Sequence, residues 1–134
     1  MKKRHLLMTA FLLVACLTAC HQETRLKEAE ALFQQGLTQR ADKQSEAAAE
    51  SFSQALLAVG RCDAKRPEVQ RLKGQIEDNL GFCYWKHELF EEALPLHTDA
   101  ANLFRALGDD TLLMTALRNC GRAAASLGDI DAAE

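Results

Sequence analysis

The sequence predicts an all-α protein, an antiparallel helical-hairpin solenoid of about two and a half repeats whose last repeat is incomplete. The first observation is a repeated spacing. Gly36 and Gly81 are each followed by three small or ring-bearing residues at offsets of 12, 16 and 19, and Gly121 is followed by Ala133 at the first offset. The residues at the three offsets are Ala48, Phe52 and Ala55, then Ala93, His97 and Ala100.

The second observation is the helical periodicity within each set. Positions i, i+4 and i+7 lie on one face of an α-helix, so Ala93, His97 and Ala100 form one stripe. A glycine inside a helix costs about 1 kcal/mol relative to alanine, so its recurrence at matching places indicates that a neighbouring backbone approaches there. The alternative is that this spacing arises by chance in an alanine-rich helical chain, and its repetition along the sequence argues against that.

Residues 1–19 are predicted to be a signal peptide. Lys2, Lys3 and Arg4 form a basic head, residues 6–19 are an apolar run of fourteen, and polar sequence begins at His21. Fourteen residues are too few for a stable transmembrane anchor but suit a secretory leader. A buried N-terminal core helix is the alternative.

Residues 17–20, Leu-Thr-Ala-Cys, resemble a bacterial lipobox, in which the leader is cut before a cysteine that carries acyl chains. The resemblance implies lipidation of Cys20. Cys16 closes a similar pattern, but cutting there would leave the apolar region near its lower limit of about seven residues. Two or three acyl chains anchor stably, so we expect residues 20–25 to be a lipid-anchored tether in a bacterial cell envelope. No Asp follows Cys20, which by resemblance to lipoprotein sorting favours the outer membrane, facing the periplasm.

The first two helices of the repeat domain, residues 26–134, are expected over residues 24–40 and 46–59. Leu26, Ala29, Phe33 and Gly36 give the first of them helical spacing. Gly60 is a natural stop for the second helix, and residues 61–66 form a charged connector.

Three further helices are expected over residues 67–86, 89–107 and 110–127. Pro67 suits the first turn of its helix, whereas Pro95 lies inside the next helix and predicts a local bend. Gly128 with Asp129 predicts a turn, after which Ile130 begins a sixth helix. Because a solenoid helix buries its apolar face against its neighbours, we expect either a longer repeat protein or self-association through the incomplete repeat.

The spacing of Leu80-Gly81, Tyr84, Ala93 and Ala100, with His97 in the aromatic place, resembles the tetratricopeptide repeat. The intervals of 45 and 40 residues between the three glycines resemble the longer-period repeats of kinesin light chains and bacterial regulators. The resemblance covers roughly residues 24–134. It departs from the family at Gln39 and Ala124, which replace the tyrosine, and at Glu77, where a large apolar residue is usual.

The resemblance implies a concave groove lined by the first helix of each pair. Asn79 and Asn119 hold matching places, and the paired donor and acceptor of an amide suit a peptide backbone. Aromatic side chains would anchor the ligand and arginines would pair with its acidic groups, although the same residues could instead pack between repeats. The implied groove residues are Phe33, Leu37, Asp78, Asn79, Phe82, Trp85, Arg118, Asn119 and Arg122.

We therefore expect a non-enzymatic protein- or peptide-binding scaffold without cofactor or metal. The alternative is the N-terminal extracytoplasmic sensor of a longer signalling or transcription regulator. His97 is expected to be a core histidine with one hydrogen bond, Cys83 and Cys120 to face inward, and Cys62 to be the more exposed thiol. Cleavage before Cys20 removes three of the 16 basic and none of the 19 acidic residues, and the resulting net charge of −6 disfavours nucleic-acid binding.

Overall fold

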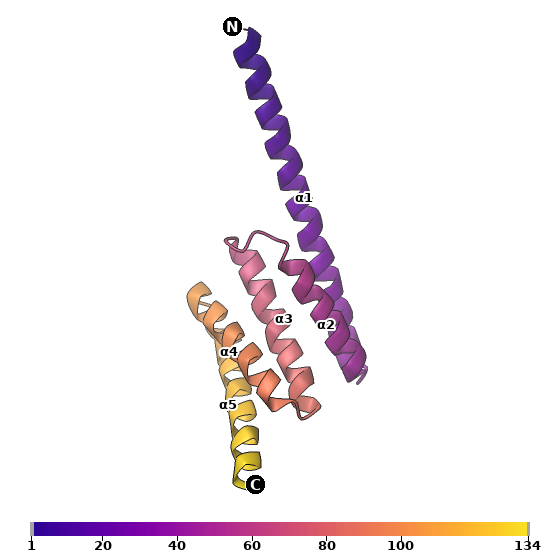
Figure 1. Ribbon diagram of the computed structural model, residues 1–134, viewed down its shortest axis with the longest axis vertical. Helices are drawn as coiled ribbons and strands as arrows, with labels where there is room; N and C mark the ends of the chain where they lie inside the picture. The colour runs from indigo at the N-terminus through magenta and orange to yellow at the C-terminus, as the bar shows by residue number, and fades with distance from the viewer. Residues whose placement is uncertain (1, 134) are drawn as a thin grey trace.

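The computed structural model describes residues 2–133, and this part of the chain folds into five helices. They are α1 (Lys2–Ala41), α2 (Ser45–Val59), α3 (Pro67–Lys86), α4 (Phe90–Leu107) and α5 (Asp110–Ala133). Each helix packs chiefly against the next one along the chain, so the protein is a row of antiparallel hairpins (Figure 1). The predicted all-α hairpin architecture is confirmed. Met1 and Glu134, the outer ends of the predicted signal peptide and repeat domain, lie outside the described residues.

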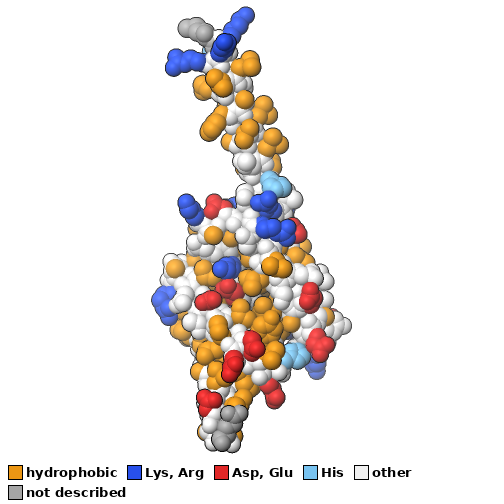
Figure 2. Space-filling model, in the orientation of Figure 1, with side chains coloured by type: hydrophobic (Ala, Val, Ile, Leu, Met, Phe, Trp, Pro, Cys, Tyr) orange, Lys and Arg blue, Asp and Glu red, His pale blue; other side chains and the backbone are white. Residues whose placement is uncertain are grey.

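The N-terminal segment differs from the expectation because α1 runs without interruption from Lys2 to Ala41. Its first half projects from the packed helices, with apolar side chains along its length and basic ones at its tip (Figures 1 and 2). No residue of its most apolar window is buried, so the alternative of a buried core helix is wrong. By length and composition this helix is sufficient to cross a membrane, a test that a signal sequence also passes.

The expected tether at residues 20–25 is helical and its second half contacts the domain. The backbone N–H of Asp63 donates a hydrogen bond to Gln22 Oε1 at 3.1 Å, and Arg66 pairs with Glu23 at 2.7 Å. Residues 2–35 contain neither glycine nor proline, so no helix breaker separates the predicted leader from the first repeat helix. The connector between α2 and α3 therefore holds the middle of α1.

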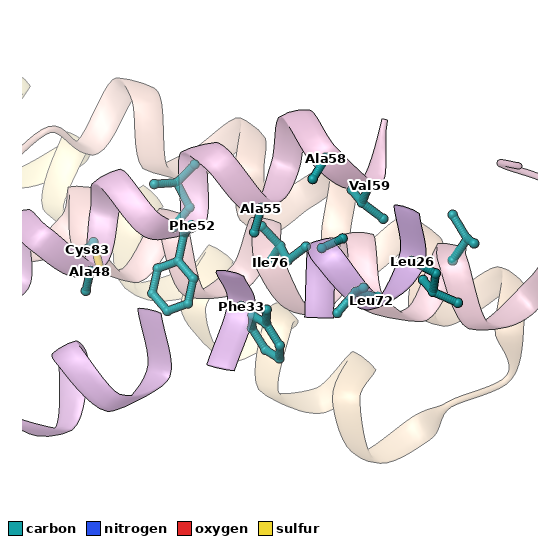
Figure 3. Close-up of a cluster of buried hydrophobic side chains, with 13 residues drawn as sticks. Leu26, Phe33, Ala48, Phe52, Ala55, Ala58, Val59, Leu72, Ile76 and Cys83 are labelled. Atoms are coloured by element: carbon teal, nitrogen blue, oxygen red, sulfur yellow. The ribbon is translucent and has the colours of Figure 1, made fainter. Parts of the chain in front are cut away.

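The larger hydrophobic core lies among α1, α2 and α3 (Figure 3). Phe33 and Phe52 pack across the α1–α2 interface with ring centroids 5.9 Å apart, and Ile76 brings α3 onto the same cluster. A second, smaller cluster joins Ala100, Ala101 and Phe104 of α4 to Ala116 of α5. Since burial stabilises in proportion to apolar area, α5 is attached by less hydrophobic contact than α1 or α2.

Rings of the second helices fill the space above the glycines of the first helices. An added Cβ on Gly36 would lie 2.5 Å from the Phe52 ring, and one on Gly74 would lie 2.7 Å from the Phe104 ring. The expected close approach is therefore present, but a side-chain ring makes it rather than a backbone. Gly121 has no such neighbour, because an added Cβ there meets nothing within 4 Å in the described structure.

Helix α5 continues through Gly128, so the predicted turn at that residue is wrong. Residues 129–133 contain one large apolar side chain, Ile130. If the chain reversed direction at Gly128, these residues would bury little apolar surface and would lose the helical hydrogen bonds that they make in α5. Helix α4 likewise runs unbroken through Pro95, as expected. The hairpin turns place one residue each in the left-handed region: Lys43 at φ 61°, Glu88 at φ 62° and Gly108 at φ 69°.

Candidate binding groove

A cleft of about 290 Å³ opens between α3 and α5, with the end of α1 at its rim. Six of the nine residues predicted for the groove line it, and they come from two helices that one helix, α4, separates in the sequence. They are Asp78, Asn79 and Phe82 on α3, and Arg118, Asn119 and Arg122 on α5. The first helices of successive hairpins thus form the walls of this cleft.

The floor of the cleft is a buried polar network centred on Asp78. His97 Nδ1 lies 2.7 Å from Asp78 Oδ1, and Asn119 Nδ2 donates to both carboxylate oxygens at 3.1 and 3.2 Å. An ionised carboxylate only accepts, so the short contact needs the proton on Nδ1. His97 is a core residue, 1% exposed, as predicted. Asp78, His97 and Asn119 therefore connect α3, α4 and α5. Asn119 thus packs between repeats, which was the alternative to contact with a ligand.

Asn79 and Phe82 are oriented by basic side chains at the rim. Arg40, the penultimate residue of α1, donates to Asn79 Oδ1 and stacks over the Phe82 ring with its guanidinium carbon 5.1 Å from the centroid. Asn79 Nδ2 donates to the Gln75 carbonyl of its own helix at 2.7 Å. A cation over an aromatic face is attracted by the ring quadrupole, so Arg40 limits the rotamers that Phe82 can adopt.

The two arginines of α5 are exposed and available to a ligand. Arg118 and Arg122 lie one helical turn apart on the cleft wall. Within residues 2–133 neither forms an ion pair, in contrast to Arg66 and Arg71, which pair with Glu68 and Asp109. Guanidinium groups bind carboxylates with two parallel hydrogen bonds, so this wall suits an acidic ligand.

Three residues predicted for the groove lie elsewhere. Phe33 is buried against Phe52, and Leu37 packs half-buried against the same core, because α1 turns its apolar stripe toward α2. Trp85 is half-buried beside Phe82, and its Nε1 donates to Ser126 Oγ at 3.2 Å. This tryptophan therefore links the C-terminal ends of α3 and α5 and does not line the cleft.

Arg40 is a basic cleft residue that sequence reasoning missed. It lies three residues after Leu37 and so falls on the same side of α1, one turn closer to the helix end. The three-residue spacing from Leu37 was therefore the sequence feature that indicated Arg40 as a further residue on this side of α1. Gln75 and Thr115, which also line the cleft, precede Asn79 and Asn119 by four residues and complete the same two faces.

Glu77 is an unusual buried carboxyl on α3, 4% exposed, at the position where the family carries a large apolar residue. Burial raises the pKa of Glu77 to about 7, with Lys73 acting in the opposite direction from 3.7 Å. Its Oε2 has no hydrogen-bond partner among the described atoms. An unsatisfied buried oxygen destabilises the folded chain at pH values where the group is ionised.

Cys62, Cys83 and Cys120 are free thiols. Burial raises the pKa of Cys62, Cys83 and Cys120. Cys83 is buried, as expected, and Cys62 is half-buried, with its sulfur 3.8 Å from the Ala58 carbonyl oxygen. In the described range, no three His, Cys, Asp or Glu side chains are grouped to hold a metal ion.

A sequence model of the tetratricopeptide repeat family matches residues 73–134. The match includes most of α3 with all described residues of α4 and α5, and therefore both walls of the cleft. Comparisons with curated proteins and with solved structures found no match.

Proposed function

We propose that the tetratricopeptide-repeat domain at residues 73–134 makes this protein a binding scaffold for a protein or peptide partner, without catalysis of its own. The observation that carries the proposal is the cleft between α3 and α5. It places an orienting amide, an aromatic ring and two unpaired arginines on one concave surface. Aromatic and arginine side chains supply much of the binding energy at protein interfaces. Fold alone does not fix function, so the proposal rests on this site.

The hairpin of α1 and α2 extends the repeat array in this proposal. Phe52 covers Gly36 as His97 covers Gly81, sixteen residues apart in both pairs. The intervals of 45 and 40 residues between Gly36, Gly81 and Gly121 support the longer-period type found in kinesin light chains. The end of α1 then contributes Arg40 to the groove of the following repeat.

The scaffold is held at a membrane through acyl chains on Cys20, facing the periplasm from the bacterial outer membrane. The exposed apolar helix before Cys20 supports a removable leader. Gln22, two residues after Cys20, already contacts the α2–α3 connector. Lipidation would therefore hold the domain directly against the membrane surface.

Metabolic labelling with a radioactive fatty acid tests the anchor. The wild-type chain and Cys16→Ala should take up label, and Cys20→Ala should not. Equal labelling of Cys20→Ala and wild type would reject the assignment of the lipidated residue.

Selection of peptides from a displayed library on the full chain in detergent tests the binding function. Selected peptides should lose affinity for Phe82→Ala and keep it for Leu57→Ala, which removes an apolar side chain 72% exposed on α2, outside the cleft. Circular dichroism checks that both variants are folded. Peptides that bind both variants equally well would place recognition elsewhere.

A further inference from the structure

A second cleft, of about 390 Å³, lies on the other side of Phe82 from the α3–α5 cleft. It is formed by the turn between α1 and α2 and by the C-terminal end of α3. Its lining includes Lys43, Lys86 and His87, and it shares Arg40 and Phe82 with the first cleft. The two clefts are therefore adjoining, with one aromatic ring between them.

The basic side chains around this ring are concentrated and unpaired. Of the 16 lysines and arginines in the chain, five line the two clefts. Of the 19 aspartates and glutamates, only Asp78 is among the described residues that line them. The carboxylate of Asp78 already accepts hydrogen bonds from His97 and Asn119. Within the described chain the five basic groups have no carboxylate within 4 Å. They are Arg40, Lys43, Lys86, Arg118 and Arg122.

Two of these cations lie close to the ring of Phe82. Arg40 lies over the ring at 5.1 Å, and Lys86 Nζ lies 5.9 Å from its centroid. The ring thus offers an apolar contact between two positive regions, Lys43 and Lys86 on one side and Arg118 and Arg122 on the other. Like charges held together raise the electrostatic potential of a concave surface and attract an anionic ligand.

We infer that the two clefts together bind an extended acidic segment of a partner protein. Acidic side chains on both sides of one apolar residue would occupy the two basic regions, and the apolar residue would contact Phe82. The charge complementarity argues for this occupant, because the chain as a whole is acidic and would otherwise repel it. The inference rests on the proposed function and specifies the chemistry of the partner.

Fluorescence anisotropy on the full chain in detergent tests the inference with four labelled probes. The first peptide carries a central leucine between pairs of glutamates, the second has glutamine and the third has lysine in place of glutamate, and the fourth probe is a single-stranded oligonucleotide. The glutamate peptide should bind at least about tenfold more tightly than the glutamine peptide, and its affinity should fall as salt is raised. The lysine peptide should not bind.

Variants of the second cleft test whether its positive charges contribute to binding, without an effect on the stability of the fold. Lys43→Gly relieves a left-handed backbone conformation, so it removes a positive charge without loss of stability. Combined with Lys86→Gln it should weaken binding of the glutamate peptide about tenfold. Lys65→Gln, an exposed lysine on the α2–α3 connector, is the matched control and should change nothing. Lys86→Glu should recover affinity for a peptide in which lysines replace the glutamates on one side of leucine.

The outcomes distinguish this inference from the proposed function. Equal binding of the glutamate and glutamine peptides, lost in Phe82→Ala, would keep the peptide-binding groove and overturn the acidic partner. Binding of the glutamate peptide that is unaffected by the Lys43 and Lys86 changes would also overturn it. Binding of the oligonucleotide with no binding of any peptide would overturn both.

Discussion

Gly81 lies beneath the imidazole of His97, so close that an added Cβ would be 2.9 Å from Cε1 of that ring. The same ring places Nδ1 2.7 Å from Asp78 on the cleft floor. The close approach of α4 to α3 and the polar floor of the groove therefore depend on one side chain.

Gly81→Ala should lower the free energy of unfolding by about 1–3 kcal/mol, because the methyl group forces the buried imidazole from its place. Gly121→Ala is the matched control. Its Cβ meets nothing within 4 Å, so the higher helix propensity of alanine should raise stability by about 0.5–1 kcal/mol. Urea unfolding followed by circular dichroism measures both. Equal effects of the two substitutions would contradict the packing described here.

Asn119→Ala should loosen α5 and leave the first hairpin intact. The change removes the donor to both oxygens of Asp78 and should cost about 1–3 kcal/mol, since the carboxylate stays buried. Hydrogen exchange should accelerate in α5 while α1 and α2 keep their protection. Asn102→Ala, an exposed residue that bonds only Arg105 on its own helix, should leave exchange unchanged.

The buried carboxyl of Glu77 should make stability depend on pH. Its pKa is raised by burial from 4.5 to about 7, so the folded state holds the proton more tightly than the unfolded state. The stabilising effect of that proton is full below pH 4.5 and is lost as pH rises through about 7. The free energy of unfolding of the wild type should therefore fall over this interval relative to Glu77→Gln. A parallel pH dependence of the two proteins, measured by urea titration, would contradict this prediction.

The turn at Glu88 should gain stability from glycine. Glu88 has φ 62°, a left-handed conformation that costs an L-residue roughly 1–2 kcal/mol. Glu88→Gly should raise the free energy of unfolding by about 1 kcal/mol, and Gly108→Ala, at φ 69°, should lower it by a similar amount. Thermal unfolding measures both shifts, and changes of the same sign would show that the turns are not controlled by backbone strain.

Local patterns predicted most of the fold. Pro67 and the apolar spacing gave the bounds of α3, and the fixed offsets from Gly81 predicted that His97 is buried. The continuation of α5 past Gly128 was missed because a glycine near a helix end is typical of a stop, and only tertiary packing decides whether the chain reverses there. The unbroken α1 was missed because a predicted boundary between leader and domain rests on a processing signal, which need not interrupt a helix.

The groove was predictable in outline and its chemistry was not. The walls of the cleft follow from the repeat spacing, and Asn79 and Phe82 both line it. The bond between Asp78 and Asn119 joins residues 41 positions apart, and no local pattern indicates it. The basic concentration around Phe82 is likewise assembled from separate elements, since Arg40 lies in the last turn of α1 and Lys86 is the last residue of α3. Neither residue belongs to a run of like charges.

Photocrosslinking in living cells tests the central claim, that the groove between α3 and α5 is the binding surface. A photoreactive phenylalanine analogue at position 82 keeps an aromatic ring in the groove, and the same analogue at Leu57 places it on exposed α2. The account predicts a discrete adduct with a partner protein from position 82 and none from position 57. Adducts from position 57 with none from position 82 would contradict it.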